Sequence, residues 1–373
     1  MKRFVCYLLA LMLVLSFSVT VSAQETVKFG ANLEMTGAVA AYGQMIWEGA
    51  NLAQEMVPEV LGMPVEFVLV DNKSDRVETA NAQTRLIDRD QVVAILGPAT
   101  SGNMLAAGPI SDENQVPVIS ATATLPIVTE GREYVFRACF LDPYQAAAAA
   151  QFAIEEMGAQ TVAVFPDIAQ DYCIGLANYF KEAFTERGGT IVAEQFCRTG
   201  DQDFSAQLTT IMAANPDLLY IPNYYTETAL IVRQARDLGY EGMVLGADGI
   251  DVPELVDVGG AAVNGIYFTA HADTTTALTE VGQEYFDLYR EKYGREPAVF
   301  GALAADAYLM VINAIERAGS LDPVAIRNEL EATENLEVVT GTVTVTAGNI
   351  TKPVVVKQVV EGNYEFVTAI SPE

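Results

Sequence analysis

Two stretches rich in small hydroxyl side chains follow apolar runs that are typical of buried strands. The first, Gly97–Gly102, contains Ser101, and the second, Ser120–Pro126, contains Thr122 and Thr124. At the start of a helix, free backbone N–H groups and hydroxyls can hold a carboxylate, because the helix dipole favours negative charge there. These stretches could therefore bind an anionic group.

An acid and several aromatic side chains occupy similar positions further along the chain. Asp248 lies in a glycine-flanked strand end and suits an ammonium group. Tyr42, Tyr172 and Tyr224 each stand just past an expected strand, and Phe300 is a further pocket candidate. The combination could enclose a small molecule that carries both charges.

Each of these features also has a purely structural interpretation. Thr100 or Ser101 can simply cap the following helix, and the residues 120–126 can form a polar loop. Asp248 can close an Asx-turn, and single tyrosines often pack at the surface. The sequence leaves these alternatives open.

Other chemistries are disfavoured. The chain has 21 Lys and Arg against 49 Asp and Glu, a net charge of -28, which repels nucleic acid. The common nucleotide, hydrolase and zinc-protease motifs are missing, and we expect no catalytic residue, metal or cofactor. An exported α/β hydrolase would have to use the only histidine, His271, which is not expected beside Ser101.

The N-terminus resembles a secretory signal. Lys2 and Arg3 precede the apolar run Phe4–Phe17, and Val21-Ser22-Ala23 forms a small-x-small cleavage site. A membrane anchor is the weaker alternative, because the run is shorter than the roughly 20 residues that span a bilayer. We expect cleavage after Ala23, export to the periplasm, and no later membrane-spanning stretch.

The mature chain alternates strand-like and helical patterns, which predicts parallel sheets covered on both faces. The expected strands of the first half are Val27–Leu33, Val65–Asp71, Val92–Gly97 and Val116–Ser120. Its expected helices are Tyr42–Met56, Arg76–Asp88 and Ser101–Asn114. Ligands of such sheets bind at the carboxyl ends of the strands.

The same alternation restarts after Asp142-Pro143. Strands are expected at Thr161–Phe165, Thr190–Phe196, Leu218–Pro222 and Met243–Leu245. Helices are expected at Gln145–Met157, Tyr172–Arg187, Phe204–Ala213 and Thr226–Leu238. Thr279–Gly319 is mostly helical, and Val338–Val367 is typical of β-hairpins. Two doubly wound lobes of similar size fit this pattern.

These segments resemble the periplasmic leucine/isoleucine/valine-binding protein family, the type I solute-binding proteins of ABC transporters. The similar stretches are Gly37–Gly43, Gly97–Ser101, Ser120–Pro126, Phe136–Phe140 with Asp142-Pro143, Asp201–Ser205, Val232–Arg236 and Gly246–Gly249. The similarity extends over the mature chain, and the order of the motifs is more specific than any one of them.

The resemblance implies a Venus-flytrap clamp of two parallel-sheet α/β lobes joined by a three-strand hinge. Lobe 1 would comprise residues 24–141 and 270–340, and lobe 2 residues 142–269 and 341–373. The crossings would lie near Phe140–Asp142, Thr269–Ala272 and Thr340–Thr342. The clamp would capture an amino acid, branched-chain or similar, and deliver it as a monomer to an inner-membrane ABC permease.

The resemblance also implies roles for single residues. Ser101 and Thr124 would hold the α-carboxylate, and the Thr122 backbone, the Thr124 hydroxyl and Asp248 the α-ammonium. The remaining members of the implied ligand-binding set are Ala99, Tyr42, Tyr172, Tyr224 and Phe300.

Two differences from the leucine-binding members concern which ligand side chain this protein prefers. Asp248 stands where those members have Glu, one methylene longer. Their first-lobe disulfide cannot form here, because Lys73 and Thr100 occupy the matching region. An amide, urea or aromatic acid therefore remains an alternative solute, and a sensory receptor an alternative role.

Three cysteines remain after the signal. Cys173 and Cys197 follow neighbouring strands of the second lobe, so that they could form a disulfide in an oxidising compartment or remain two free thiols. Cys139 is expected to be a small buried apolar residue.

Overall fold

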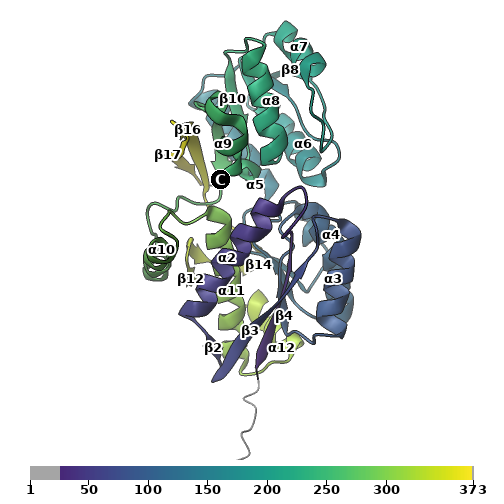
Figure 1. Cartoon of the computed structure of the whole chain (residues 1–373), viewed down its shortest axis with the longest axis vertical. Coiled ribbons are helices and arrows are strands. Elements are labelled where there is room, and N and C mark those ends of the chain that lie inside the picture. Colours follow the sequence, from purple (N-terminus) through teal and green to yellow (C-terminus); the bar gives the residue numbers. More distant parts are fainter. Residues whose placement is uncertain (1–25, 372–373) are drawn as a thin grey trace, which may run out of the picture.

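The computed structural model describes residues 26–371, and it consists of two lobes, each built on one sheet (Figure 1). The expected signal peptide and its cleavage site lie outside the described residues. Each lobe has helices on both faces of its sheet, and the chain passes between the lobes near the middle of the molecule. The predicted α/β fold class is confirmed.

The first sheet has six strands in the order β2-β3-β1-β4-β5-β6. They are β1 (Val27–Leu33), β2 (Glu59–Val60), β3 (Met63–Asp71), β4 (Ala94–Leu96), β5 (Val118–Ser120) and β6 (Val135–Arg137). All pair in parallel except the edge strand β2, which is antiparallel to β3. In β1 every residue but Lys28 is buried, as expected of a strand covered on both faces.

Helices from distant parts of the chain belong to this lobe. They are α2 (Ala40–Met56), α3 (Arg76–Asp88), α4 (Ser101–Asn114), α10 (Glu280–Tyr293), α11 (Val299–Ala318) and α12 (Pro323–Glu331). Helices α2 and α11 pack so closely that a Cβ on Gly49 would lie 2.1 Å from the Gly301 carbonyl oxygen. Glycine is required at this helix crossing.

One helix of the described residues, α11, is long and apolar enough to span a membrane, with a mean hydropathy of 1.5. The expectation that no later stretch reaches this level is therefore wrong. Most of α11 is buried in the protein, among the side chains of the first lobe. This burial is typical of the central helix of a protein core.

The second sheet has seven strands in the order β17-β16-β11-β10-β9-β7-β8. They are β7 (Thr161–Val164), β8 (Thr190–Glu194), β9 (Leu218–Ile221), β10 (Met243–Gly246), β11 (Tyr267–Ala270), β16 (Val354–Val360) and β17 (Asn363–Ile370). Strands β16 and β17 form an antiparallel hairpin on the edge of an otherwise parallel sheet. The helices are α5 (Asp142–Glu155), α6 (Asp171–Glu186), α7 (Ser205–Ala214), α8 (Tyr225–Asp237) and α9 (Glu254–Gly259).

Short elements complete the fold. They are the 3-10 turns η1 (Pro126–Val128), η2 (Asp248–Ile250) and η3 (Gly260–Val263) and the hairpin strands β12 (Leu336–Val338), β13 (Gly341–Val343), β14 (Val345–Thr346) and β15 (Asn349–Ile350). The β14–β15 hairpin lies against the first sheet, because the Arg137 amide donates to the Gly348 carbonyl over 3.0 Å. The residues 341–350, expected in lobe 2, thus contact lobe 1, and the chain reaches the second sheet only at Val354.

The helix α12 was not expected, although its start has a clear local signal. Asp322 accepts a hydrogen bond from the Val324 amide, and Pro323 occupies the first helical position. Both features are typical of a helix N-terminus.

Candidate functional site

The carboxyl ends of both sheets face each other around a small cavity between the lobes. Its volume is about 20 Å³, which is room for about one water molecule. The cavity is lined by Tyr42, Ala99, Thr100, Ser101, Thr122, Tyr172, Tyr224, Asp248, Gly249 and Phe300. Every expected ligand-binding residue except Thr124 is therefore part of its wall, and the lobes are closed upon each other.

Thr124 lies behind this wall. Its side chain is fully buried, and its hydroxyl faces the carboxyl group of Asp142, whose amide donates to the Thr124 carbonyl over 3.1 Å. Thr124 can meet a ligand only after the neighbouring groups have moved.

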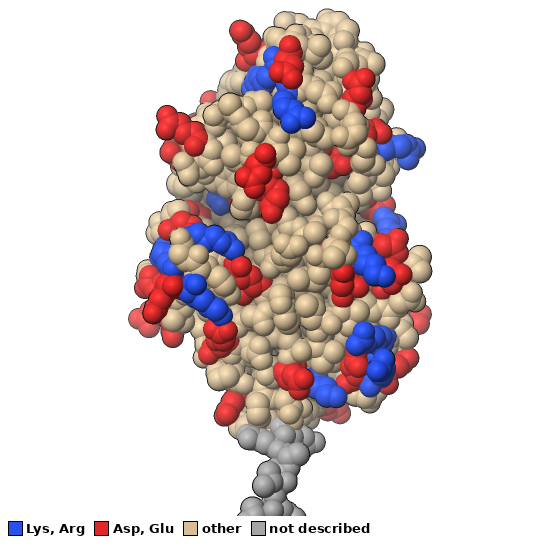
Figure 2. Space-filling model, in the orientation of Figure 1, with Lys and Arg blue, Asp and Glu red and all other residues tan. Residues whose placement is uncertain are grey.

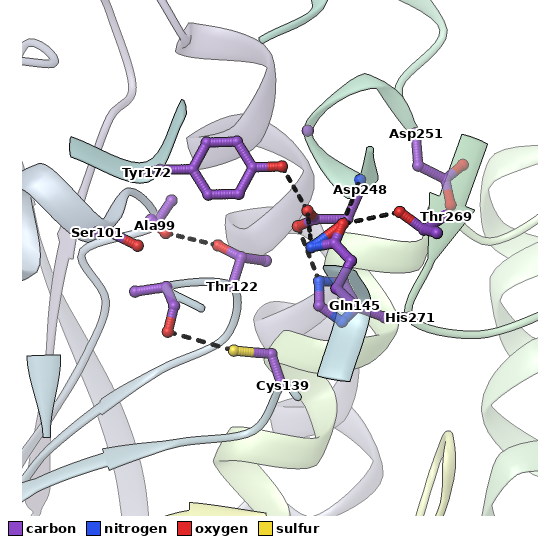
Figure 3. Close-up of polar contacts among 12 residues, drawn as sticks. Ala99, Ser101, Thr122, Cys139, Gln145, Tyr172, Asp248, Asp251, Thr269 and His271 are labelled. Carbon is purple, nitrogen blue, oxygen red and sulfur yellow. Dashed lines mark hydrogen bonds and ion pairs between the residues drawn. The ribbon is translucent and has the colours of Figure 1, made fainter. Parts of the chain in front are cut away.

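The Asp248 carboxylate is the centre of a buried network (Figure 3). Its Oδ1 accepts hydrogen bonds from the Tyr172 hydroxyl at 2.6 Å and from Gln145 Nε2 at 2.7 Å, and His271 Nε2 lies 3.0 Å from its Oδ2. Gln145 is itself oriented, since its Oε1 accepts from the Thr269 hydroxyl at 2.8 Å. The Asx-turn interpretation is wrong, because these partners are distant in sequence.

Three bonds leave this carboxylate with about one free acceptor position, because a carboxylate offers about four. The hydrogen bonds of this network fix the orientation of the Asp248 carboxylate toward the cavity. Gln145, Thr269 and His271 were not expected in this role, and His271 is instead a partner of the acid on the second lobe.

A second buried acid, Glu34, was also missed. Its carboxylate accepts hydrogen bonds from the amides of Ala99 at 3.0 Å and Thr100 at 3.2 Å, and from Asn103 Nδ2 at 2.8 Å. The chain's own carboxylate therefore satisfies two of the N–H groups that the sequence assigned to a ligand. Its position, directly after β1, is the signal that could have found it.

The hydroxyl groups of the first lobe test the structural interpretations given above for Thr100, Ser101 and Thr122. Thr100 caps α4 by accepting from the Asn103 amide, as one alternative stated. Ser101 Oγ accepts from the Leu125 amide at 3.2 Å, and the Thr122 hydroxyl donates to the Ala99 carbonyl at 2.8 Å. Both Ser101 and Thr122 still line the cavity.

Aromatic rings close the cavity from both lobes. Tyr42 of α2 makes edge contacts with Tyr224 at 5.5 Å and Phe300 at 5.1 Å between ring centroids, and Tyr172 stacks on Tyr224 at 5.4 Å. The Tyr42 hydroxyl donates to the Gly249 carbonyl of the other lobe at 2.5 Å. Burial is the main reason that the pKa of Tyr42 is well above its usual value, so the hydroxyl keeps its proton.

Tyr42→Phe should favour the open form, because it removes the hydrogen bond between the Tyr42 hydroxyl and Gly249 while keeping the ring contacts. A buried hydrogen bond contributes about 1 kcal/mol, so ligand affinity should fall by about fivefold. Calorimetry measures the affinity, and small-angle scattering the radius of gyration. Thr36→Val, outside the cavity wall, is the control, and an unchanged affinity in Tyr42→Phe would contradict the role.

Charged side chains are scattered among neutral ones over both lobes (Figure 2). On this face of the described chain they form no continuous basic strip. One ion pair joins the lobes at the rim, between Arg76 at the start of α3 and Asp171 at the start of α6.

The disulfide alternative is wrong, because Cys139, Cys173 and Cys197 are all free and buried thiols. Asn223 Nδ2 contacts Cys197 Sγ at 3.7 Å. Burial raises the pKa of all three thiols, that of Cys139 to about 12.

These three thiols should therefore not react in the folded protein, since the thiolate is the nucleophile. A thiol reagent at pH 8 should label none in native buffer and all three after denaturation in urea, as read by mass spectrometry. Failure of Cys173 and Cys197 to react in urea without reductant would indicate a disulfide.

Comparisons with known proteins show what this chain is similar to. A family model described as periplasmic binding protein matches residues 26–363. A "Leu/Ile/Val-binding protein homolog 3" of Brucella melitensis is 31% identical over 339 residues, which cover 89% of this chain and 90% of the relative.

Two solved structures are also similar. A leucine-binding protein LivK of Thermotoga maritima has 47% identity and a TM-score of 0.91, with 93% of this chain and 99% of that chain covered. A branched-chain amino acid substrate-binding protein LivJ of Streptococcus pneumoniae, in complex with isoleucine, has 34% identity and a TM-score of 0.87, with 92% and 99% covered.

Proposed function

Because this chain belongs to the periplasmic binding protein family, we propose that it is the substrate-binding component of an ABC importer for a branched-chain or similar amino acid. One observation carries the proposal. The Ser101 hydroxyl and Thr122 on one lobe and the carboxylate of Asp248 on the other line the same cavity. An α-amino acid carries the complementary pair of charges.

Each end of the ligand has a matching group. Ser101 and, once exposed by opening, Thr124 bind the α-carboxylate. The free acceptor position of Asp248, the Thr122 carbonyl and the Thr124 hydroxyl bind the α-ammonium. The rings of Tyr42, Tyr172, Tyr224 and Phe300 surround the ligand side chain, and Ala99 contributes backbone.

Closure follows from contacts that exist only when the lobes meet. The Tyr42–Gly249 hydrogen bond and the Arg76–Asp171 ion pair join the lobes, and a bound zwitterion adds contacts to both. Moving a two-state balance from 1:99 to 99:1 requires about 5.5 kcal/mol of differential binding. Charge-assisted hydrogen bonds in a buried site can supply that amount.

The closed clamp, a monomer in the periplasm after cleavage at Ala23, then docks with both rims on a membrane permease. Its lobes divide near residues 141 and 270, and the third crossing lies at 351–353 rather than at 340. The clamp binds and releases its solute without catalysis.

The test is calorimetry of the purified protein, unfolded and refolded to remove any copurified solute, against leucine, isoleucine, valine, alanine and phenylalanine. Micromolar or tighter binding of a branched-chain member supports the proposal. Absence of binding by every amino acid, together with binding of an amide, urea or an aromatic acid, would contradict it.

A further inference from the structure

Asp142 is a buried acid that the proposed binding reaction does not use. It is the first residue of α5, at the point where the chain first crosses from one lobe to the other. Its side chain is fully buried, and neither carboxyl oxygen makes a hydrogen bond of regular geometry among the described residues. Ionisation of a carboxyl group at a buried position costs free energy, because the carboxylate loses its hydration and no cation compensates for that loss.

A second acid lies close to it. Gln145, in the same helical turn as Asp142, donates to Asp248 Oδ1 over 2.7 Å. Gln145 thus acts on both carboxyl groups, and the charge of Asp248 also acts on Asp142. Two carboxylates in one buried site oppose each other's ionisation.

The positive charge nearest in the chain, Arg137 of β6, is directed elsewhere. Its guanidinium donates to the carbonyls of Ala123 at 2.7 Å and Leu125 at 3.0 Å and to the Thr129 hydroxyl at 3.0 Å. The other titratable groups that face Asp142, or that bind the Asp248 beside it, are Cys139, Tyr172, Tyr179, Tyr220, Tyr224 and His271. No lysine or arginine among the described residues forms an ion pair with Asp142.

Burial, and next the charge of Asp248, raise the pKa of Asp142 to about 8. The Thr124 hydroxyl, Arg137 and Gln145 act in the opposite direction, but less strongly. In the closed form the carboxyl group is therefore mostly protonated at neutral pH.

The groups that act on the Asp142 carboxyl group belong to both lobes. Thr124 and Arg137 belong to the first lobe, and Gln145 and Asp248 to the second. Parting of the lobes lets water reach the carboxyl group, and a hydrated aspartate ionises at its ordinary pKa, about 3.9.

We propose that closure of the lobes over Asp142 takes up one proton from solvent, so that ligand capture is coupled to protonation of this carboxyl group. The proposal rests on the clamp function proposed above. The proton moves from bulk water or buffer to a carboxylate oxygen of Asp142, and it returns when the clamp opens.

The pKa of Asp142 is higher in the closed form than in the open form, and this difference sets the direction in which ligand affinity depends on pH. Below the open-form pKa both forms hold the proton, and closure is most favourable. As the pH rises toward about 8, the open form is ionised and closure must bind a proton, which weakens affinity by up to tenfold per pH unit. Above that pH the affinity levels off.

The experiment is calorimetric titration of leucine or isoleucine into the refolded protein at pH 7, in phosphate and in Tris. The two buffers differ in ionisation enthalpy, so the difference in measured heat gives the protons bound. We expect uptake of close to one proton in the native protein. The dissociation constant should rise between pH 6 and 8 and then flatten.

Asp142→Asn places a neutral side chain of the same shape at this position. It should bind without proton uptake from this site, with an affinity nearly independent of pH between 6 and 8.5 and tighter than that of the native protein throughout this range, because the native protein regains its full affinity only below the open-form pKa. A merely structural role for Asp142 would weaken binding at every pH instead. Asp167→Asn, a buried second-lobe acid that is bonded to Ala169 and Thr199, is the matched control and should keep the native proton uptake.

Two results would overturn the inference: binding by the native protein with no difference between the buffers, or proton uptake that persists unchanged in Asp142→Asn. The first result needs no variant, so it stands even where the variant does not fold. Absence of heat with every amino acid would instead contradict the proposed function.

Discussion

Replacing Asp248 by Asn should lower the affinity for leucine by about thirtyfold or more, while binding of 4-methylpentanoate, which lacks the ammonium group, changes little. The carboxylate is buried, and three donors hold it at the cavity. Removing one member of a buried, hydrogen-bonded charge pair costs about 2–5 kcal/mol. The amide keeps the size of the side chain but cannot neutralise an ammonium ion.

Calorimetry with both ligands on both proteins separates this effect from general damage to the site. Asp257→Asn, an exposed acid on α9, is the control and should bind both ligands as the native protein does. Equal losses for leucine and 4-methylpentanoate in Asp248→Asn would mean that the residue shapes the cavity and does not bind the ammonium group.

Lys352→Met should destabilise the folded protein by about 3–5 kcal/mol, the cost typical of a broken buried ion pair. Lys352 lies at the third crossing, and its ammonium contacts Asp306 of α11 at 2.7 Å and, just before the first crossing, the Ala138 carbonyl at 3.2 Å. Both charged side chains are buried, with 5% and 0% of their surface exposed. Without Lys352, the Asp306 carboxylate stays buried without its cation.

Urea unfolding followed by circular dichroism measures the loss. Adding Asp306→Asn to Lys352→Met should restore most of the stability, because the buried charge is then removed and Thr340 keeps an acceptor. Lys292→Met breaks the exposed pair with Glu55 and should cost less than about 1 kcal/mol. A loss in Lys352→Met no larger than in Lys292→Met would show that the pair does not stabilise the crossing.

Local signals predicted the elements well. The bounds of β1, α3 and α4 agree with the sequence patterns, because a cap or an apolar run marks them; Asp75, for example, accepts from the amides of Val77 and Glu78 at the start of α3. The strand-end rule also placed Ser101 and Asp248 at one cavity, since the carboxyl ends of both sheets converge there.

Long-range contacts could not be predicted in the same way. Gln145 and Asp248 are separated by 103 positions, and Glu34 reaches amides that lie 65 and 66 positions away. Such pairs depend on how the crossings orient the lobes, which no local pattern encodes. The cysteine alternatives stayed open for the same reason, because spacing does not give the distance between two sulfurs.

The close contact between α2 and α11 has a consequence for how the molecule is made. Helix α2 comes early in the chain, whereas α11 comes after all strands of the second sheet except the β16–β17 hairpin. Because the chain is synthesised from its N-terminus, α2 is made long before α11. Until α11 has been made, the apolar surface of the first lobe that α11 covers stays exposed. Premature truncation anywhere before α11 would therefore leave an aggregation-prone fragment, not a functional half.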